Sequence, residues 1–146
     1  MDVLFERILL LTRVPWFASL RTDQLRFIAP VLEPVSWVRG EVVFYRGEPG
    51  AQMYIVTAGA VGISLEETPA PATLVARMGP GECFGEMGIL DDLPRSATAV
   101  ALEDTDALGL EKEKLRGLLL AYPELAVSML KALSRRLRAA NDSARG

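Results

Sequence analysis

The stretch Phe84–Val100, FGEMGILDDLPRSATAV, decides how the rest of this chain is interpreted. Two glycines, Gly85 and Gly88, bracket Glu86, and glycine allows the backbone to approach a ligand closely. Residues 86–90 are expected to form one short helical turn. The first amides of such a turn point out of its N-terminus, where they favour an anion.

The second half of the stretch places a cation beside small side chains. Arg95 is followed by Ser96, Ala97 and Thr98, so its guanidinium has room to fold over a bound group and to meet two oxygens at once. Amides, a hydroxyl and a fixed cation together suit a phosphate. The carboxylate of Glu86 is out of place against a highly charged phosphate, but it suits a ligand that also offers hydroxyl donors. The predicted ligand is therefore a phosphorylated sugar of low charge.

Around this stretch, short β-rich runs alternate with glycine and proline breaks. About eight such runs lie between residues 35 and 110, and runs of five or six residues are ordinary for strands. This spacing predicts a small antiparallel barrel or jelly roll. The predicted strands are Val35–Val38, Glu41–Tyr45, Gln52–Thr57, Ala60–Leu65, Thr73–Met78, Glu82–Phe84, Ala97–Ala101 and Ala107–Leu110.

Helical periodicity appears before the predicted strands. Residues 3–11 form a short amphipathic pattern. A second helix is expected to take Thr22 as its N-cap, and Pro34 is expected to close it. The predicted fold class is therefore α+β, mainly β: an antiparallel β-roll flanked by N-terminal helices and a long C-terminal helix.

Helical periodicity returns after the predicted strands. Lys112–Leu120 is one candidate helix, and Pro123 suits the first position of a longer helix over 123–141. An apolar stripe follows this longer helix, and it is either core packing or a surface for a dimer or a lid. The basic residues beside the stripe are interpreted as a solvated helix face rather than as a DNA-binding surface. The stripe consists of Ala126, Leu130, Leu133 and Leu137.

The amino-acid composition excludes several classes of protein. The chain has 146 residues, of which 50% are apolar and 24% charged, as in one globular domain. Its net charge of −3 is unfavourable for general binding to nucleic acid or anionic membranes. With no histidine, the chain has no histidine metal ligand and no serine–histidine or cysteine–histidine catalysis. The single cysteine, Cys83, and the lack of a basic n-region or a long apolar segment favour a cytoplasmic location.

The string Phe84-Gly85-Glu86-Met87-Gly88, followed after a gap by Pro94-Arg95-Ser96-Ala97-Thr98, resembles the phosphate-binding cassette of cyclic nucleotide-binding domains. That family includes the bacterial catabolite activators and the regulatory subunits of cyclic AMP-dependent protein kinase. The upstream segment is similar too. Its matching residues are Gly40-Glu41-Val42-Val43-Phe44, Gly47, Gly50, Met53-Tyr54-Ile55-Val56, Gly59 and Val61.

The resemblance covers nearly the whole chain and implies its domain organisation. One cyclic nucleotide-binding domain is expected over residues 1–146. Within it, N-terminal helices are expected over 1–34, the β-roll with the cassette over 35–110, and C-terminal helices over 111–146.

The resemblance also implies a role for individual cassette residues. Glu86 is expected to accept a hydrogen bond from the ribose 2′-hydroxyl, and Arg95 to pair with the exocyclic oxygens of the cyclic phosphate. Backbone amides at Gly88 and Ser96 are expected to contact the same phosphate, while Gly85 lets the backbone approach the sugar. The expected ligand-binding residues are Gly85, Glu86, Met87, Gly88, Arg95, Ser96 and Ala97.

Recognition of the base is less clearly implied. The position of the activator's adenine-binding threonine falls on Ala140, whose side chain has no hydrogen-bonding group. Either Asn141 caps the base, or a leucine or Arg138 stacks on it, or base selectivity is poor. Cyclic AMP is expected in preference to cyclic GMP, and Ser96 alone does not distinguish the two.

The implied function is a regulatory sensor of a cyclic nucleotide, without a metal and without catalysis. The last helix, with Leu130, Leu133 and Leu137, would pack over the base and connect to an effector domain or to a second copy of the chain. Two alternatives stay open: a degenerate domain that serves as an interaction module, and the sensor part of a transcription regulator without its DNA-binding domain. An enzyme on a similar jelly roll, such as a cupin, is disfavoured because cupins usually hold a metal through histidines.

Overall fold

The structure is a computed structural model that describes residues 3–145. It divides into two compact units, and each is described by itself. The first to be considered is Val31–Leu115, which contains the strands and the cassette. The other consists of Met1–Pro30 with Arg116–Gly146, and its described regular secondary structure is helical.

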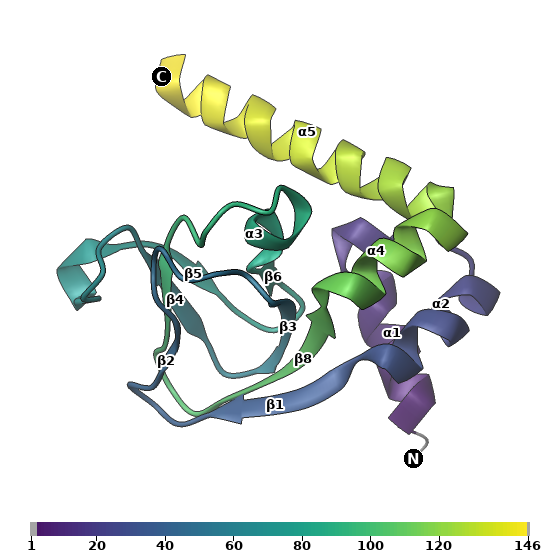
Figure 1. Ribbon diagram of the computed structural model, residues 1–146, viewed down its shortest axis with the longest axis horizontal. Coiled ribbons are helices and arrows are strands. Elements are labelled where there is room, and N and C mark those ends of the chain that lie inside the picture. The colour runs from purple at the N-terminus through teal and green to yellow at the C-terminus, as the bar shows by residue number, and fades with distance from the viewer. Residues whose placement is uncertain (1–2, 146) are drawn as a thin grey trace. The chain divides into compact units, whose positions relative to one another are not determined.

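Eight strands within Val31–Leu115 form two four-stranded antiparallel sheets (Figure 1). The strand orders are β1-β8-β3-β6 and β2-β7-β4-β5. This arrangement confirms the predicted β-roll, and the predicted strand ends lie within two residues of the observed ones. The strands are β1 Glu33–Trp37, β2 Val42–Phe44, β3 Gln52–Ala58, β4 Val61–Ser64, β5 Leu74–Met78, β6 Cys83–Phe84, β7 Thr98–Ala101 and β8 Thr105–Glu111.

The core of the β-roll lies between the two sheets, because both sheets contribute buried side chains to one cluster. Aromatic rings form its centre: Trp37 and Phe84 come from one sheet and Phe44 from the other. The rings of Phe44 and Phe84 lie 6.0 Å apart between centroids, which is within the range of favourable aromatic pairs. The smaller buried members are Val56, Val61, Ala99, Ala101 and Ala107.

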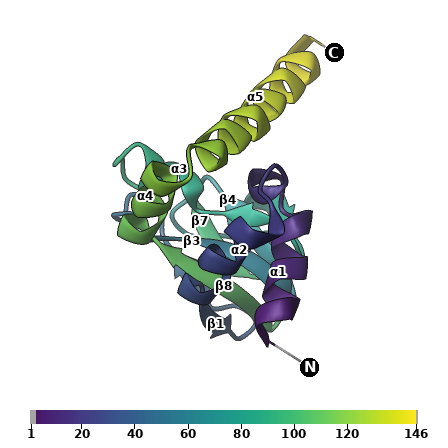
Figure 2. The same ribbon diagram turned by 90° about the vertical axis from the view of Figure 1, so that its right-hand side faces the viewer.

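Helical segments make up the other unit. Figure 2 shows α1 (Val3–Arg13) and α2 (Thr22–Ile28) packed side by side. The hydroxyl of Ser128, on α5 (Pro123–Arg145), donates to the carbonyl oxygen of Pro15 at 3.2 Å. Short 3-10 turns follow α1 and α2, and α4 connects the strands to α5. These elements are η1 Pro15–Phe17, η2 Ala29–Val31 and α4 Lys112–Ala121; a further turn, η3 Pro71–Thr73, precedes β5.

Two predictions about the N-terminal segment are wrong. Thr22 is the first residue of α2, and the N-cap is Arg21, whose backbone N–H donates to the side-chain oxygen of Gln24 at 2.9 Å. Pro34 does not close a helix, because it lies within β1. β1 is an edge strand, where a residue without an N–H is tolerated.

The C-terminal helix begins at Pro123, as predicted, and continues to Arg145. Its apolar residues divide between two environments. Leu125 and Met129 are buried, whereas Leu130 and Leu137 are 66% and 62% exposed. No single helix within residues 3–145 is both long enough and apolar enough to cross a membrane.

Candidate functional site

The cassette begins with a sharp change of direction after β6. Gly85 has a φ of +83°, which side chains rarely tolerate. α3 (Glu86–Leu90) follows directly and confirms the short helical turn predicted over residues 86–90 (Figure 1). The positive φ of Gly85 places Glu86 at the first position of this helix, where its side chain is buried.

Arg95 is the buried cation of the cassette, with only 5% of the residue exposed. Its Nη1 donates to the carbonyl oxygen of Gly85 and its Nη2 to that of Gln52, both at 2.6 Å. The Nε of Arg95 is buried and has no hydrogen-bond partner within the described part of the chain. A buried donor without an acceptor is costly, so this nitrogen indicates a place for an acceptor group.

The backbone of Arg95 is held by the loop between β2 and β3. Its N–H donates to the carbonyl oxygen of Glu48, and its carbonyl accepts from the N–H of Gly47, both at 2.8 Å. The same loop touches α3, because a Cβ built on Gly50 would lie 3.1 Å from the carbonyl carbon of Gly88. The β2–β3 loop thus holds the cassette at two places, at Arg95 and at Gly88.

Charges around Arg95 counteract its burial. Burial lowers the pKa of the Arg95 guanidinium, and the nearby Tyr54, Glu48 and Glu86 raise it. Burial likewise raises the pKa of the Tyr54 phenol, against the opposing effect of the Arg95 charge. Glu86 and Arg95, which the sequence assigns to the same ligand, are therefore buried close enough together to interact electrostatically.

The remaining predicted ligand-binding residues differ in their exposure to solvent. Ser96 is exposed and Ala97 is half-buried, so this side of the cassette faces outward. Gly88 is buried within α3. Met87 also belongs to α3, but its side chain lies outside what the structure describes.

The two predicted base-capping residues lie on α5. Arg138 and Asn141 are both exposed there. They belong to the helical unit, whereas the cassette belongs to Val31–Leu115. Contact between these side chains and a ligand at the cassette stays a prediction.

Sequence reasoning missed two groups that hold Arg95. One is the carbonyl of Gln52, since a backbone acceptor leaves no signal in the residue types. The other is Phe44, whose ring centroid lies 4.0 Å from the Arg95 Cζ. An apolar residue in a predicted strand is normally assigned to the core, and only the three-dimensional position of Phe44 reveals the cation above it.

One pocket borders the cassette on the side of the β2–β3 loop. It has a volume of about 260 Å³. An ion pair between Lys112 and Asp92 joins two of its lining residues, one at the start of α4 and one in the cassette. The lining residues are Gly47, Pro49, Gly50, Gly88, Asp92, Leu93, Pro94 and Lys112.

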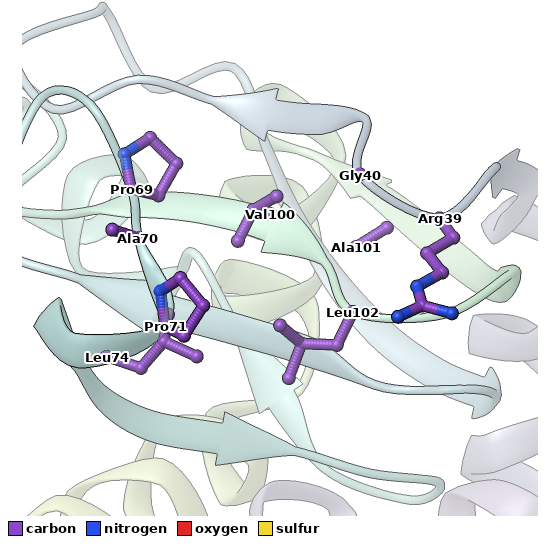
Figure 3. A pocket seen from close by; sticks show the side chains of 9 residues that line it. All are labelled: Arg39, Gly40, Pro69, Ala70, Pro71, Leu74, Val100, Ala101 and Leu102. Carbon is purple, nitrogen blue, oxygen red and sulfur yellow. The ribbon is translucent and has the colours of Figure 1, made fainter.

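A second pocket, of about 250 Å³, lies elsewhere on the β-roll (Figure 3). It is formed by the turn before β2, the loop before β5 and the end of β7. Its lining is mainly apolar, with Pro69, Pro71, Leu74 and Leu102, and Arg39 is its one charged side chain. This composition does not suit a polar phosphorylated sugar, so the cassette remains the candidate site.

Comparison with known proteins gives the same assignment. The sequence profile of the cyclic nucleotide-binding domain matches residues 34–122. The chain is 32% identical over 134 residues to a CRP-like cAMP-activated global transcriptional regulator of Mycobacterium tuberculosis, covering 92% of this chain and 60% of that protein. It is 35% identical to the cyclic AMP receptor protein of Thermus thermophilus, covering 87% of this chain and 59% of that protein.

Comparison with solved structures finds the same kind of fold. The crystal structure of the N-terminal domain of a transcriptional regulator from Streptomyces coelicolor superposes with a TM-score of 0.74 at 35% identity, covering 92% of this chain and 94% of that one. The chain spans about 60% of the length of the two curated relatives. With the matched profile, the β-roll and the buried cassette together, this chain belongs to the cyclic nucleotide-binding domain family.

Proposed function

We propose that this chain is a regulatory domain that senses a cyclic nucleotide, bound at the cassette around Arg95. The observation that carries the proposal is the buried guanidinium of Arg95, whose Nε has no acceptor among the described residues while its Nη1 and Nη2 donate to backbone carbonyls. A bound anion would satisfy that nitrogen. Charge-assisted bonds from a guanidinium are the stronger kind of hydrogen bond, so they suit recognition of a phosphate.

The charge of the site favours a diester over a more highly charged phosphate. Arg95 is accompanied by the buried carboxylate of Glu86 and by the nearby carboxylate of Glu48. A cyclic phosphate carries a single negative charge, which one guanidinium can match. Backbone amides at Gly88 and Ser96 would add donors to the same phosphate.

Glu86 is assigned to the sugar. A buried carboxylate accepts hydrogen bonds and donates none when ionised. The 2′-hydroxyl of a ribose is a donor of the required kind, and it is present in a cyclic nucleotide. Gly85 supports this role, because its φ of +83° turns the chain so that Glu86 begins α3.

Cyclic AMP is the proposed ligand in preference to cyclic GMP. Two relatives at 32% and 35% identity are named for cyclic AMP, which supports this choice. The side chains proposed to meet the base are Arg138 and Asn141 on α5. An amide at Asn141 both donates and accepts, and so it is able to pair with the edge of a purine.

The proposed output is a change in the C-terminal helix. The chain spans 60% of a relative that is named as a global transcriptional regulator, which supports a role as the sensor part of such a protein. The exposed Leu130 and Leu137 on α5 are free to pack over a bound base or against a partner helix. Ligand binding shifts such a helix only by the difference in affinity between its two positions.

Thermal unfolding in the presence of nucleotides tests the proposal. A ligand at 100 times its dissociation constant stabilises the native state by about 2.7 kcal/mol, which is well within the resolution of a melting curve. Cyclic AMP is expected to raise the melting temperature more than cyclic GMP does. Adenosine serves as the control without phosphate. A melting curve unmoved by either cyclic nucleotide would leave the chain as a degenerate member that keeps the fold as an interaction module.

A further inference from the structure

The guanidinium of Arg95 lies on the face of an aromatic ring. Its Cζ is 4.0 Å from the ring centroid of Phe44, a residue of β2 that is only 8% exposed. The face of an aromatic ring carries partial negative charge and attracts a cation, and the attraction increases when water is excluded. Both partners are buried here, so the contact belongs to the stronger class of such interactions.

This contact stabilises a buried cation without using its hydrogen-bond donors. A guanidinium has five N–H groups, and two of those of Arg95 reach the carbonyl oxygens of Gln52 and Gly85. The Nε–H has no acceptor among the described residues, so it is left for a ligand. A carboxylate in place of the ring would occupy the same donors and compete with a phosphate.

The ring is itself held in place. Phe44 packs against Phe84 with 6.0 Å between ring centroids, and Phe84 packs against Tyr54 with 5.2 Å. Gly85 leaves room beside this pair, because a Cβ there would lie 2.8 Å from the Arg95 Nη1 and 3.4 Å from the Phe44 ring. A side chain at position 85 would therefore press on both the guanidinium and the ring.

We propose that Phe44 is a positioning residue for ligand binding, acting through Arg95: its ring fixes the plane of the guanidinium so that the Nε–H faces an incoming phosphate. This inference rests on the proposed function. It adds a residue that touches no part of the ligand. Its effect on affinity arises in the free protein, where the ring keeps Arg95 in the competent orientation.

The size of the effect follows from that equilibrium. When only a fraction of the free protein is competent, the apparent dissociation constant rises by the inverse of that fraction. Loss of a desolvated cation–π contact allows Arg95 to leave its place, so Phe44→Leu is expected to weaken binding of cyclic AMP by about threefold to tenfold. Phe17→Leu is the matched control, because Phe17 is a fully buried phenylalanine of the helical unit and belongs neither to the ring cluster nor to the cassette.

Fluorinated phenylalanines separate the charge effect from packing. Replacing Phe44 with singly, doubly and triply fluorinated phenylalanine withdraws charge from the ring face while almost preserving its volume, so these proteins fold even if Phe44→Leu does not. The affinity for cyclic AMP is expected to fall stepwise with each added fluorine at position 44. The same series at position 17 is expected to leave the affinity unchanged.

An NMR chemical shift reports the orientation of the Arg95 guanidinium directly. The Nε–Hε resonance of Arg95, identified by its disappearance in Arg95→Lys, is expected to show an upfield ring-current shift in the free protein. That shift is expected to be lost in Phe44→Leu and kept in Phe17→Leu. A structural role in the core alone would not predict this difference.

The possible outcomes distinguish the two proposals. If the unmodified chain binds no cyclic nucleotide in calorimetry, the proposed function fails. If it binds, but fluorination at position 44 leaves the affinity unchanged, or the Arg95 resonance lacks a ring-current shift, the role of Phe44 is overturned. Stepwise weakening at position 44, together with the shift, supports it.

Discussion

The carbonyl oxygen of Gly85 accepts a hydrogen bond from Nη1 of Arg95 at 2.6 Å, and the close approach depends on the missing side chain of the glycine. A Cβ at this position would lie 2.8 Å from the same nitrogen. Gly85 also has a φ of +83°. The positive φ and the small space beside Arg95 therefore both require glycine at this position. The lack of a side chain at Gly85 leaves room for the buried guanidinium of Arg95.

Gly85→Ala is expected to weaken cyclic AMP binding by about tenfold or more, because the new methyl group displaces the guanidinium that carries the binding. Calorimetry measures this affinity. Gly81→Ala is the matched control, since Gly81 has a similar φ of +85° but open space around its Cβ position. Both variants are expected to lose about 1 kcal/mol of stability from the strained φ, and only Gly85→Ala is expected to lose affinity. Equal affinities in the two variants would contradict this account of Gly85.

Asp92 provides a separate test of backbone strain in the cassette. It has a φ of +59° and forms an ion pair with Lys112, the first residue of α4. Asp92→Ala and Asp92→Gly both remove the ion pair, but only the alanine strains the backbone further. The alanine variant is expected to be less stable than the glycine variant by about 1 kcal/mol in urea unfolding.

The ion pair itself is expected to contribute little. The Asp92 side chain is 55% exposed, and pairs of this kind contribute about 0–1 kcal/mol. Lys112→Gln is expected to lower the free energy of unfolding by no more than that, and less at 1 M salt, where the screening length is about 3 Å. A loss several times larger would show that the pair has a structural role beyond its Coulomb attraction.

The raised pKa of Tyr54 predicts how the free energy of unfolding changes with pH in the alkaline range. Burial raises the pKa of its phenol above the ordinary value of about 10, so the folded state keeps the proton where the unfolded state has released it. The folded state then binds more protons, and stability is expected to fall as the pH rises from about 10. Tyr54→Phe is expected to reduce this slope in urea unfolding, whereas Tyr45→Phe, at an exposed position, serves as the control. The same slope in Tyr54→Phe and in the unmodified chain would contradict the assignment.

The exposed face of α5 predicts self-association. Val127, Leu130 and Leu137 are 50%, 66% and 62% exposed, and their spacing of three and seven residues places them along one side of the helix. A dimer through this face is therefore expected in sedimentation equilibrium. Leu130→Glu is expected to dissociate it, and Lys131→Glu, at the adjacent position, is expected to leave it intact. A monomer at every concentration of the unmodified chain would rule out this face as a dimer contact.

The sequence predicts the parts of the fold that depend on local patterns. Alternating short strands and glycines specify the β-roll, and Pro123 marks the start of α5 because proline is well suited to the first turn of a helix. The wrong predictions occur where contacts with other parts of the chain override the local structural preference of a residue. Thr22 is a better capping residue than Arg21, yet the Gln24 side chain caps the backbone of Arg21 instead. Pro34 interrupts helices in general, but it also fits an edge strand such as β1.

The candidate site shows a similar division. Glu86 and Arg95 were identifiable because their charges stand out among small residues. Both are buried, with 5% exposure each, and they interact electrostatically. The groups that hold Arg95 were not identifiable. The carbonyl of Gln52 is common to every residue type, and Phe44 lies more than fifty positions from Arg95 in the chain. Their contribution depends on how the two sheets pack, because Phe44 and Gln52 lie in different sheets.

Calorimetric titration of cyclic AMP into the Arg95→Ala variant tests the central claim most directly. A charge-assisted hydrogen bond contributes roughly 1.5–3 kcal/mol, so the affinity is expected to fall by about tenfold or more relative to the unmodified chain. Arg77→Ala, which removes an exposed arginine paired with Glu103, is expected to bind as the unmodified chain does. Cyclic AMP binding to Arg95→Ala with unchanged affinity would contradict the account.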